Sequence, residues 1–423
     1  MNRQTALVAY RAASDVAGKA AFFLVTVAAA RRLSPEAFGV FSLATTVGWI
    51  AAIATDFGIQ LHLARAVARR PDDASRLLRV WLKLRIGTAS AALALITAGL
   101  FAVPAARRYA PAIALLVATY LISGLIEFLH YFYRGLSRSD VESTLTLGQR
   151  LATLAVAIFA LWLRPDVTLL AAAMLLPVVA TFAYSARLAT VLAPGPTTRP
   201  VSPSLPAAPA VATLFAELKR DVFPIGAGVV LSALYFRVDV LLVEMWNGAH
   251  AVGMYNAVFR LVEALRLFPA AVLAVTLPAL CRATTLRPVA QVSGIVTAFA
   301  VVASIAAWAS AGWLIPFLYG APYAEAVPAF RVLLFAFPLM SLNYALTHQL
   351  IGWNGHRAYA AVCGAAFLFN LALNSRLIPS LSIVGAAWST VWTEVVLTAG
   401  CAAAIWIRSA RPGVESSIVV GAL

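Results

Sequence analysis

Charged side chains are scarce in this chain. Only 12% of its 423 residues are Asp, Glu, Lys or Arg, whereas 62% are hydrophobic and the mean hydropathy is +0.87. A soluble globular protein carries roughly 25% charged residues. The composition therefore excludes a soluble domain of useful size and predicts that most of the chain lies in lipid.

Motifs for nucleotide, metal or nucleophilic chemistry are also missing. There is no GxxxxGK[ST] phosphate-binding loop and no HExxH motif, and the five histidines are dispersed. The cysteines Cys281, Cys363 and Cys401 lie far apart without metal-ligand spacing, and the last two fall in apolar runs that predict small core residues. We therefore expect no enzyme activity, no cofactor and no metal.

Acidic residues are few, with 17 Asp and Glu against 32 Lys and Arg, which gives a net charge of +15. Nucleic-acid binding requires a solvated basic patch, whereas the basic residues here stand in short loops between apolar runs. We expect no nucleic-acid partner. The charge instead indicates cytoplasmic loops beside anionic lipid, and an anionic substrate.

What the sequence does contain is long apolar runs. A membrane-spanning helix needs about 20 mostly apolar residues, a length that also excludes the alternating strands of a β-barrel. We predict an all-α polytopic membrane protein with twelve transmembrane helices. They cover about 10–30, 38–60, 81–103, 111–133, 144–163, 168–192, 222–244, 252–278, 291–316, 327–352, 358–376 and 384–407.

The basic residues of the loops predict the orientation of these spans. With a cytoplasmic N-terminus, 20 Lys and Arg residues fall on the cytoplasmic side, 6 on the opposite side and 6 inside spans. This bias predicts that both termini are cytoplasmic. The first 19 residues are too polar for a cleavable signal peptide.

A proline-rich segment divides the chain near its middle. Six prolines between 194 and 209 forbid a regular helix. We predict a six-helix bundle over 1–192, a cytoplasmic linker over 193–221, a second six-helix bundle over 222–407 and a cytoplasmic tail over 408–423. A faint repeat supports the duplication, because Gly39 and Gly253 precede similar aromatic positions at the start of a span in each half.

Charged residues recur inside the predicted spans at helical spacing. Asn256, Arg260, Glu263 and Arg266 fall within an arc of about 120° on one helix, so they form a single polar stripe. Further embedded charges stand in the first and seventh predicted spans, namely Asp15, Lys19, Arg237 and Asp239. Arg237 and Asp239 are expected on opposite sides of their helix.

Polar stripes occur on other spans as well. They include Trp49, Asp56 and Gln60 in the second, Tyr120, Ser123 and Glu127 in the fourth, Asn343 in the tenth, and Thr390, Glu394 and Thr398 in the twelfth. An Arg–Glu pair sometimes only locks two helices together, so a structural role is an alternative for each pair. Because the embedded basic groups outnumber their acidic neighbours, we favour stripes from both halves that converge on a central cavity holding an anion.

Residues 31–69, RRLSPEAFGVFSLATTVGWIAAIATDFGIQLHLARAVAR, resemble a known family. The stretch is similar to the R-L-(L/G)-P-E-x-(F/Y)-G-x-(F/Y) opening, followed by D-x-G and a basic loop, of Wzx-type polysaccharide and O-antigen flippases of the multidrug/oligosaccharidyl-lipid/polysaccharide exporter superfamily. Residues 236–265 and 384–396 also resemble the seventh-to-eighth and twelfth spans of that family. The layout is similar over essentially the whole chain.

This resemblance implies a transporter of the bacterial inner (cytoplasmic) membrane. It would translocate undecaprenyl-diphosphate-linked oligosaccharide, an O-antigen (lipopolysaccharide) or exopolysaccharide repeat unit, from the cytoplasmic to the periplasmic leaflet. The cavity would open alternately to each side. Membrane lipids and other polysaccharide assembly proteins would be its partners.

By position, the candidates for binding the substrate are Lys19, Arg237, Arg260 and Arg266, and those for positioning or ion coupling are Asp15, Asp239 and Glu263. One alternative is a multidrug-type cation antiporter of the same superfamily, which would require buried acidic groups. The other is a multipass glycosyltransferase or polymerase acting on the same lipid carrier, which would require a sizeable extracytoplasmic loop.

Overall fold

The computed structural model describes residues 3–102, 104–193, 222–282, 287–353 and 355–409, and these residues form helices without a β-strand. The predicted all-α class is therefore confirmed for the described part of the chain. The predicted linker over 193–221 and tail over 408–423 fall almost entirely outside it, as does the side chain of Cys281.

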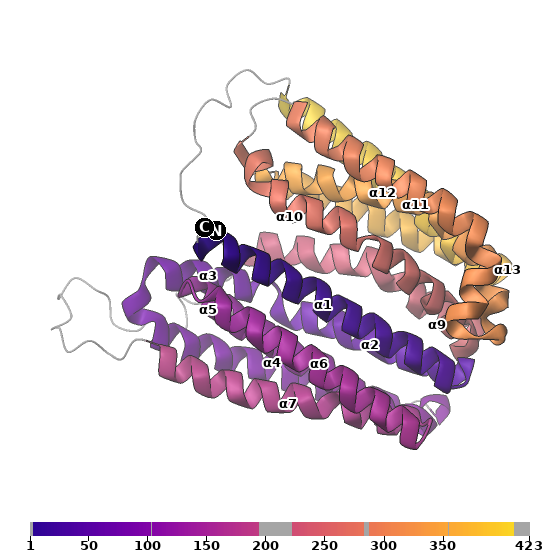
Figure 1. Ribbon diagram of the computed structural model, residues 1–423, viewed down its shortest axis with the longest axis horizontal. Coiled ribbons are helices and arrows are strands. Elements are labelled where there is room, and N and C mark those ends of the chain that lie inside the picture. The colour runs from indigo at the N-terminus through magenta and orange to yellow at the C-terminus, as the bar shows by residue number, and fades with distance from the viewer. Residues whose placement is uncertain (1–2, 103, 194–221, 283–286, 354, 410–423) are drawn as a thin grey trace. The chain divides into compact units, whose positions relative to one another are not determined.

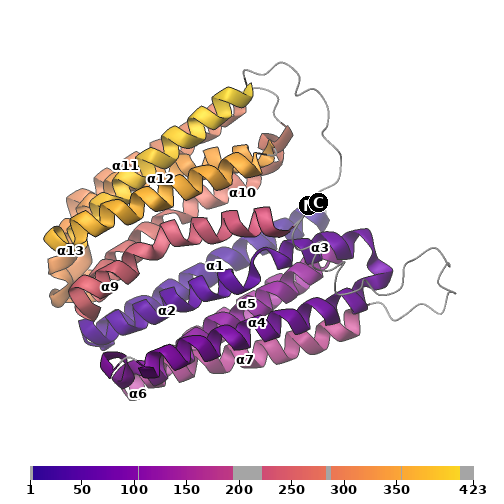
Figure 2. The same cartoon turned by 180° about the vertical axis from the view of Figure 1, so that it is seen from behind.

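Within each described range the helices follow one another through short connections (Figures 1 and 2). They are α1 (Arg3–Arg32), α2 (Pro35–Asp56), α3 (Ile59–Arg69), α4 (Ala74–Ala102), α5 (Ala110–Gly135), α6 (Ser139–Leu163), α7 (Val167–Leu192), α9 (Phe223–Leu265), α10 (Leu267–Arg282), α11 (Arg287–Tyr319), α12 (Val327–Gly352) and α13 (His356–Ser409). Short 3₁₀ turns over Pro71–Asp73, Pro104–Tyr109 and Ala321–Ala326 join some of them.

Nine helical stretches within the described ranges are long and apolar enough to cross a membrane. Two of them are much longer than one span requires, and each contains a break. Gly248 interrupts α9 with φ 76°, and Ser382 interrupts α13 with φ 50°. Each of the two elements is therefore a pair of helices, as the sequence predicted near these positions. Large apolar side chains remain exposed on the helices, among them Leu95, Trp162 and Val302, as expected for surfaces that face lipid.

The eighth predicted span, 252–278, is wrong as one continuous helix. The structure ends α9 at Leu265 and starts α10 at Leu267, so Arg266 stands at the junction. Pro269 explains the break, because it has no N–H to donate to the carbonyl of Leu265 and its ring clashes with the preceding turn.

The basic segment after the second span is also more ordered than predicted. Asp56 ends α2 and accepts hydrogen bonds from the N–H groups of Gly58 and Gln60 at 3.0 and 3.3 Å. The short helix α3 then begins and buries Leu63 and Val67. A segment expected to be a loop is thus an amphipathic helix. Its apolar residues occupy only one face, so hydropathy averaged over the length of a membrane span does not reveal the helix.

The described residues group into two compact units. Unit 1 comprises Met1–Phe22 and Ala44–Val230, and unit 2 comprises Phe23–Leu43 and Leu231–Leu423. Within unit 1, α5 packs against α3, α4 and α7, and α6 packs against α7. Within unit 2, α12 packs against α11 and α13, and α10 packs against α11 and α12. The predicted bundle boundaries at 192 and 222 stay a prediction.

Each unit has its own apolar core. In unit 1, Trp81, Phe128 and Phe132 are almost completely buried among α3, α4 and α5. The Tyr133 hydroxyl donates to the Ser185 carbonyl oxygen at 2.6 Å and so joins α5 to α7. In unit 2, Cys363 and Cys401 are buried together with Leu397, which agrees with their predicted role as small core residues.

The two glycines of the faint repeat meet within unit 2. A Cβ built on Gly253 would lie 3.2 Å from the Gly39 nitrogen and would overlap the Pro35 carbonyl oxygen, and one built on Gly39 would overlap the Ala249 carbonyl oxygen. The start of α2 and the second half of α9 therefore cross backbone to backbone. Only residues without a side chain permit so close an approach.

We predict that Gly39→Ala destabilises the protein, because the added methyl group forces α2 away from α9. The thermal unfolding temperature of the detergent-solubilised protein should fall by several degrees. The matched control is Gly312→Ala in α11, where a Cβ meets nothing within 4 Å and where alanine favours the helix by up to about 1 kcal/mol. Equal unfolding temperatures for the two variants would contradict the prediction.

Candidate functional site

A cluster of charged side chains lies inside unit 2, between the two halves of α9. The Arg237 Nη1 donates to the Asn256 Oδ1 at 3.0 Å, and its Nη2 donates to the Glu263 Oε1 at 2.6 Å. The Arg237 side chain is only 4% exposed. The break at Gly248 folds α9 back on itself, which is why residues 26 positions apart are ion-paired.

Glu263 also forms an ion pair with a second arginine. The Arg260 Nη1 donates to the Glu263 Oε2 at 2.7 Å, one turn away on the same helix. A carboxylate with both oxygens occupied in this way cannot neutralise both guanidinium groups. Arg237 and Arg260 therefore share the charge of this one carboxylate.

Arg266 adds a third guanidinium group to the same unit. Its Cζ lies 5.0 Å from the centroid of the Phe236 ring and 5.9 Å from that of Tyr344. Among the described residues no carboxylate oxygen lies within 4 Å of it. Aromatic faces attract a cation without cancelling its charge, so Arg266 adds a third positive charge to the stripe.

Asp239, predicted on the opposite side of its helix from Arg237, binds other partners than Arg237 does. It is 2% exposed, and its carboxylate accepts from the Val240 N–H at 2.8 Å and from the Tyr255 hydroxyl at 2.5 Å. The same hydroxyl lies 3.2 Å from that of Thr390. Two neutral donors from α9 thus hold this carboxylate, and Thr390 of α13 contacts one of them.

A further buried carboxylate, Glu394 of α13, was not among the predicted site residues. The Asn343 Nδ2 of α12 donates to its Oε2 at 2.6 Å, and the Thr398 hydroxyl donates to the Asn343 Oδ1 at 2.8 Å. The sequence carried a signal for this network, because all three residues belonged to predicted polar stripes. Which stripes face each other is decided only by the packing of α12 on α13.

The structure therefore brings together only some of the predicted site residues. Arg237, Arg260 and Glu263 are in direct contact, and Arg266 follows on the same stripe. Lys19 belongs to unit 1, where its side chain is exposed. The side chain of Asp15 lies outside the described residues.

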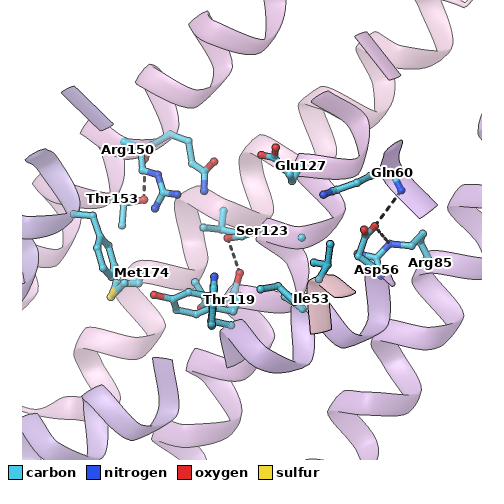
Figure 3. Close-up of a pocket in the computed structure, with 18 residues that line it drawn as sticks. Ile53, Asp56, Gln60, Arg85, Thr119, Ser123, Glu127, Arg150, Thr153 and Met174 are labelled. Carbon is cyan, nitrogen blue, oxygen red and sulfur yellow. Dashed lines mark hydrogen bonds and ion pairs between the residues drawn. The ribbon is translucent and has the colours of Figure 1, made fainter. Parts of the chain in front are cut away.

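Unit 1 contains a cavity of about 230 Å³, whose lining includes several charged and polar residues. The predicted stripes of the second and fourth spans both reach it, through Trp49 and Asp56 on α2 and through Ser123 and Glu127 on α5. Figure 3 shows Asp56 and Arg85 at one end of the cavity, Arg150 and Thr153 at the other, and Ser123 and Glu127 between them.

The sequence did not predict that Arg85 is buried. It falls near the start of the third predicted span, about 81–103, and lies on α4 with a side chain that is 0% exposed. Its Nε is 3.4 Å from the Asp56 Oδ1. Neither Nη atom has a hydrogen-bond partner among the described residues. A cation so near a predicted span boundary is ambiguous in sequence, and only the packing of α4 against α5 decides its burial.

Comparison with known proteins gives one family and one fold. A family model described as "Polysaccharide biosynthesis protein" matches residues 6–284. No curated protein matches the sequence.

Solved structures similar to this chain are transporters of the MOP superfamily. The chain resembles an inward-facing multidrug resistance MATE family transporter with a TM-score of 0.74 and 15% identity, covering 92% of this chain and 94% of that one. It resembles the lipid II flippase MurJ in an inward closed conformation with a TM-score of 0.69 and 11% identity, covering 94% and 88%. A MOP transporter from Pyrococcus furiosus gives a TM-score of 0.64 at 15% identity, covering 95% and 94%. At these identities the likeness shows the fold.

We predict that Glu263→Gln destabilises the protein, because it leaves the buried Arg237 without its carboxylate. Removing one partner of a buried ion pair costs roughly 3–5 kcal/mol. The thermal unfolding temperature should therefore fall clearly. Glu325→Gln is the matched control, since that side chain is 77% exposed and only faces His250 at 3.8 Å. A loss no greater than that of the control would show that Arg237 does not depend on Glu263.

Proposed function

Because the chain belongs to the polysaccharide biosynthesis protein family, we propose that it is a flippase for lipid-linked oligosaccharides. It moves repeat units of O-antigen or exopolysaccharide, carried on undecaprenyl diphosphate, from the cytoplasmic to the periplasmic leaflet of the bacterial inner membrane. The similarity in fold to the lipid II flippase MurJ supports a substrate in which a sugar is joined to a lipid.

The observation that carries the proposal is the cluster of three arginines around Glu263 in unit 2. Arg237 and Arg260 share the single carboxylate of Glu263, and Arg266 is held by aromatic rings. Positive charge that is not neutralised inside a membrane protein is costly, and an anionic ligand offsets this cost when it binds. A diphosphate matches the planar fork of arginine, whose N–H groups bind phosphate oxygens in pairs.

The roles of the site residues follow from their contacts. Arg260 and Arg266 are the more accessible cations and bind the diphosphate, while the buried Arg237 keeps Glu263 in place between them. Lys19 is proposed to join them in binding the substrate. The three acidic residues Asp15, Asp239 and Glu263 position the basic side chains or exchange a coupling ion.

The membrane arrangement is part of the same proposal. Twelve spans form two bundles of six around a central cavity, with both termini in the cytoplasm, and the cavity opens alternately to either side. The breaks at Gly248 and Ser382 support this count, because they divide two overlong helices into four. The loop charges, 20 on one side against 6 on the other, support the orientation.

A multidrug-type antiporter is the competing function within the same fold. Its cationic substrates require a site of net negative charge. The arginine cluster has the opposite sign, whereas the buried Asp239 and Glu394 are already held by Tyr255 and Asn343. The charge of the cluster therefore favours the flippase.

We predict that Arg260→Ala and Arg266→Ala abolish polysaccharide export while the protein stays folded and inserted. Each change removes a cation that receives the diphosphate, so transport is lost although the membrane spans are intact. Export is measured as surface polysaccharide, and insertion as the amount of full-length protein in the membrane fraction. The control is Arg376→Ala, which removes an exposed arginine of α13 in the same unit. Export that survives both changes would reduce the cluster to a structural role.

A deletion strain separates the flippase from a polymerase or ligase. We expect loss of the protein to accumulate single lipid-linked repeat units inside the cell, because synthesis continues while transfer stops. Loss of a polymerase would still deliver single units to the surface. Radiolabelled lipid-linked units in the two leaflets provide the measurement, and flipping in proteoliposomes with and without an ion gradient identifies the driving force.

A further inference from the structure

The cavity of unit 1 has no part in the binding of the diphosphate described above. We infer that this cavity, lined by Asp56, Arg85, Glu127, Gln149 and Arg150, is a second substrate site that binds one neutral sugar residue of the lipid-linked oligosaccharide. The inference rests on the proposed function for the identity of its ligand. Its geometry and charge come from unit 1 alone.

The first argument is charge balance. Two arginines, Arg85 and Arg150, face the cavity together with two carboxylates, Asp56 and Glu127. The nearby Arg134 is bound by Glu142, with Nε to Oε2 at 2.8 Å. The lining therefore has no charge surplus of either sign. An anion would need a positive site and an organic cation a negative one, whereas a neutral polyhydroxyl group needs neither.

The second argument is the mixture of donors and acceptors. A sugar hydroxyl both donates and accepts, so it suits a site with guanidinium donors, carboxylate acceptors and groups that do both. Gln60 and Gln149 supply the last kind along the cavity wall, and Ser123, whose hydroxyl donates to the Thr119 carbonyl oxygen at 2.8 Å, adds an acceptor. They lie on α3, α6 and α5, so the polar groups surround the space (Figure 3).

The third argument is that the buried guanidinium group of Arg85 has unsatisfied hydrogen-bond donors. Both of its Nη atoms lack a hydrogen-bond partner among the described residues, and Asp56 reaches only its Nε, at 3.4 Å. Leaving buried donors unsatisfied costs roughly 1–3 kcal/mol each, and more for a charged group.

The fourth argument is shape. Trp49 and Tyr120 offer aromatic faces beside the polar groups, and a pyranose presents apolar C–H faces between its hydroxyls. Ligand sites for drug-sized molecules occupy about 300–1,000 Å³. A cavity of about 230 Å³ is smaller and fits one monosaccharide, not a whole repeat unit. The site would thus bind a single sugar residue of the substrate.

The test compares two lipids on the full-length, detergent-solubilised protein. One is undecaprenyl diphosphate without sugar, and the other is the lipid-linked oligosaccharide extracted from cells that lack the protein. Equilibrium affinities are measured by native mass spectrometry. We expect Gln149→Leu to weaken binding of the glycosylated lipid about tenfold, the loss of one or two hydrogen bonds, and to leave the bare lipid unchanged.

Matched variants keep the result interpretable. Gln349→Leu in α12 makes the same change at a side chain that is 0% exposed and lies in unit 2, and it should alter neither affinity. Ser123→Ala removes only a hydroxyl from the cavity and should weaken the glycosylated lipid alone, even if Gln149→Leu fails to fold. Arg260→Ala should weaken both lipids by the same factor.

Three outcomes would overturn the inference. The first is that the unaltered protein binds the two lipids with equal affinity. The second is that the cavity variants lose affinity for both lipids by the same factor. The third is that Gln149→Leu loses binding of tetraphenylphosphonium, which would make the cavity a cation site. The proposed function fails separately. If Arg260→Ala leaves both affinities unchanged, the arginine cluster does not bind the diphosphate, whatever the cavity variants do.

Discussion

The ion pair between Arg237 and Glu263 is the interaction on which the rest of the arrangement in unit 2 depends. An almost fully buried guanidinium group is tolerated in an apolar helix bundle only when a carboxylate and further hydrogen-bond acceptors reach it. Glu263 and Asn256 provide them, at 2.6 and 3.0 Å. With Glu263 fixed in this way, Arg260 shares its carboxylate, and the proposed site gathers the positive charge that an anionic substrate requires.

Backbone breaks make this ion pair geometrically possible. The reversal at Gly248 brings Arg237 beside Asn256 and Glu263, although the sequence separates them by 19 and 26 positions. Pro269, in the first turn of α10, separates this helix from α9, so that Arg266 stands at a junction instead of within a regular turn. The close crossing of Gly39 and Gly253 fixes the reversed segment against the start of α2. Irregular backbone and functional charge therefore occur in the same part of the unit.

The two units differ in the chemistry of their polar interiors. Unit 2 gathers arginines around one carboxylate, whereas the cavity of unit 1 pairs two arginines with two carboxylates and adds amides and hydroxyls. A substrate that joins a diphosphate to neutral sugars contains both kinds of group. The division of charge between the units is thus matched by the division of charge within the proposed substrate.

The sequence by itself determined the all-helical class, nearly all the helix positions and the polar stripe of Arg260, Glu263 and Arg266, because hydrophobic length and helical spacing are local properties. It placed Arg237 and Asp239 on opposite sides of one helix for the same reason. Only the tertiary structure decided that Arg237 and Arg260 share Glu263, that Asn343 binds Glu394, and that Arg85 is buried beside a cavity. Such pairings depend on which helix faces pack together. A stripe of polar residues fixes a direction around its own helix axis, but it does not identify the neighbour that it meets.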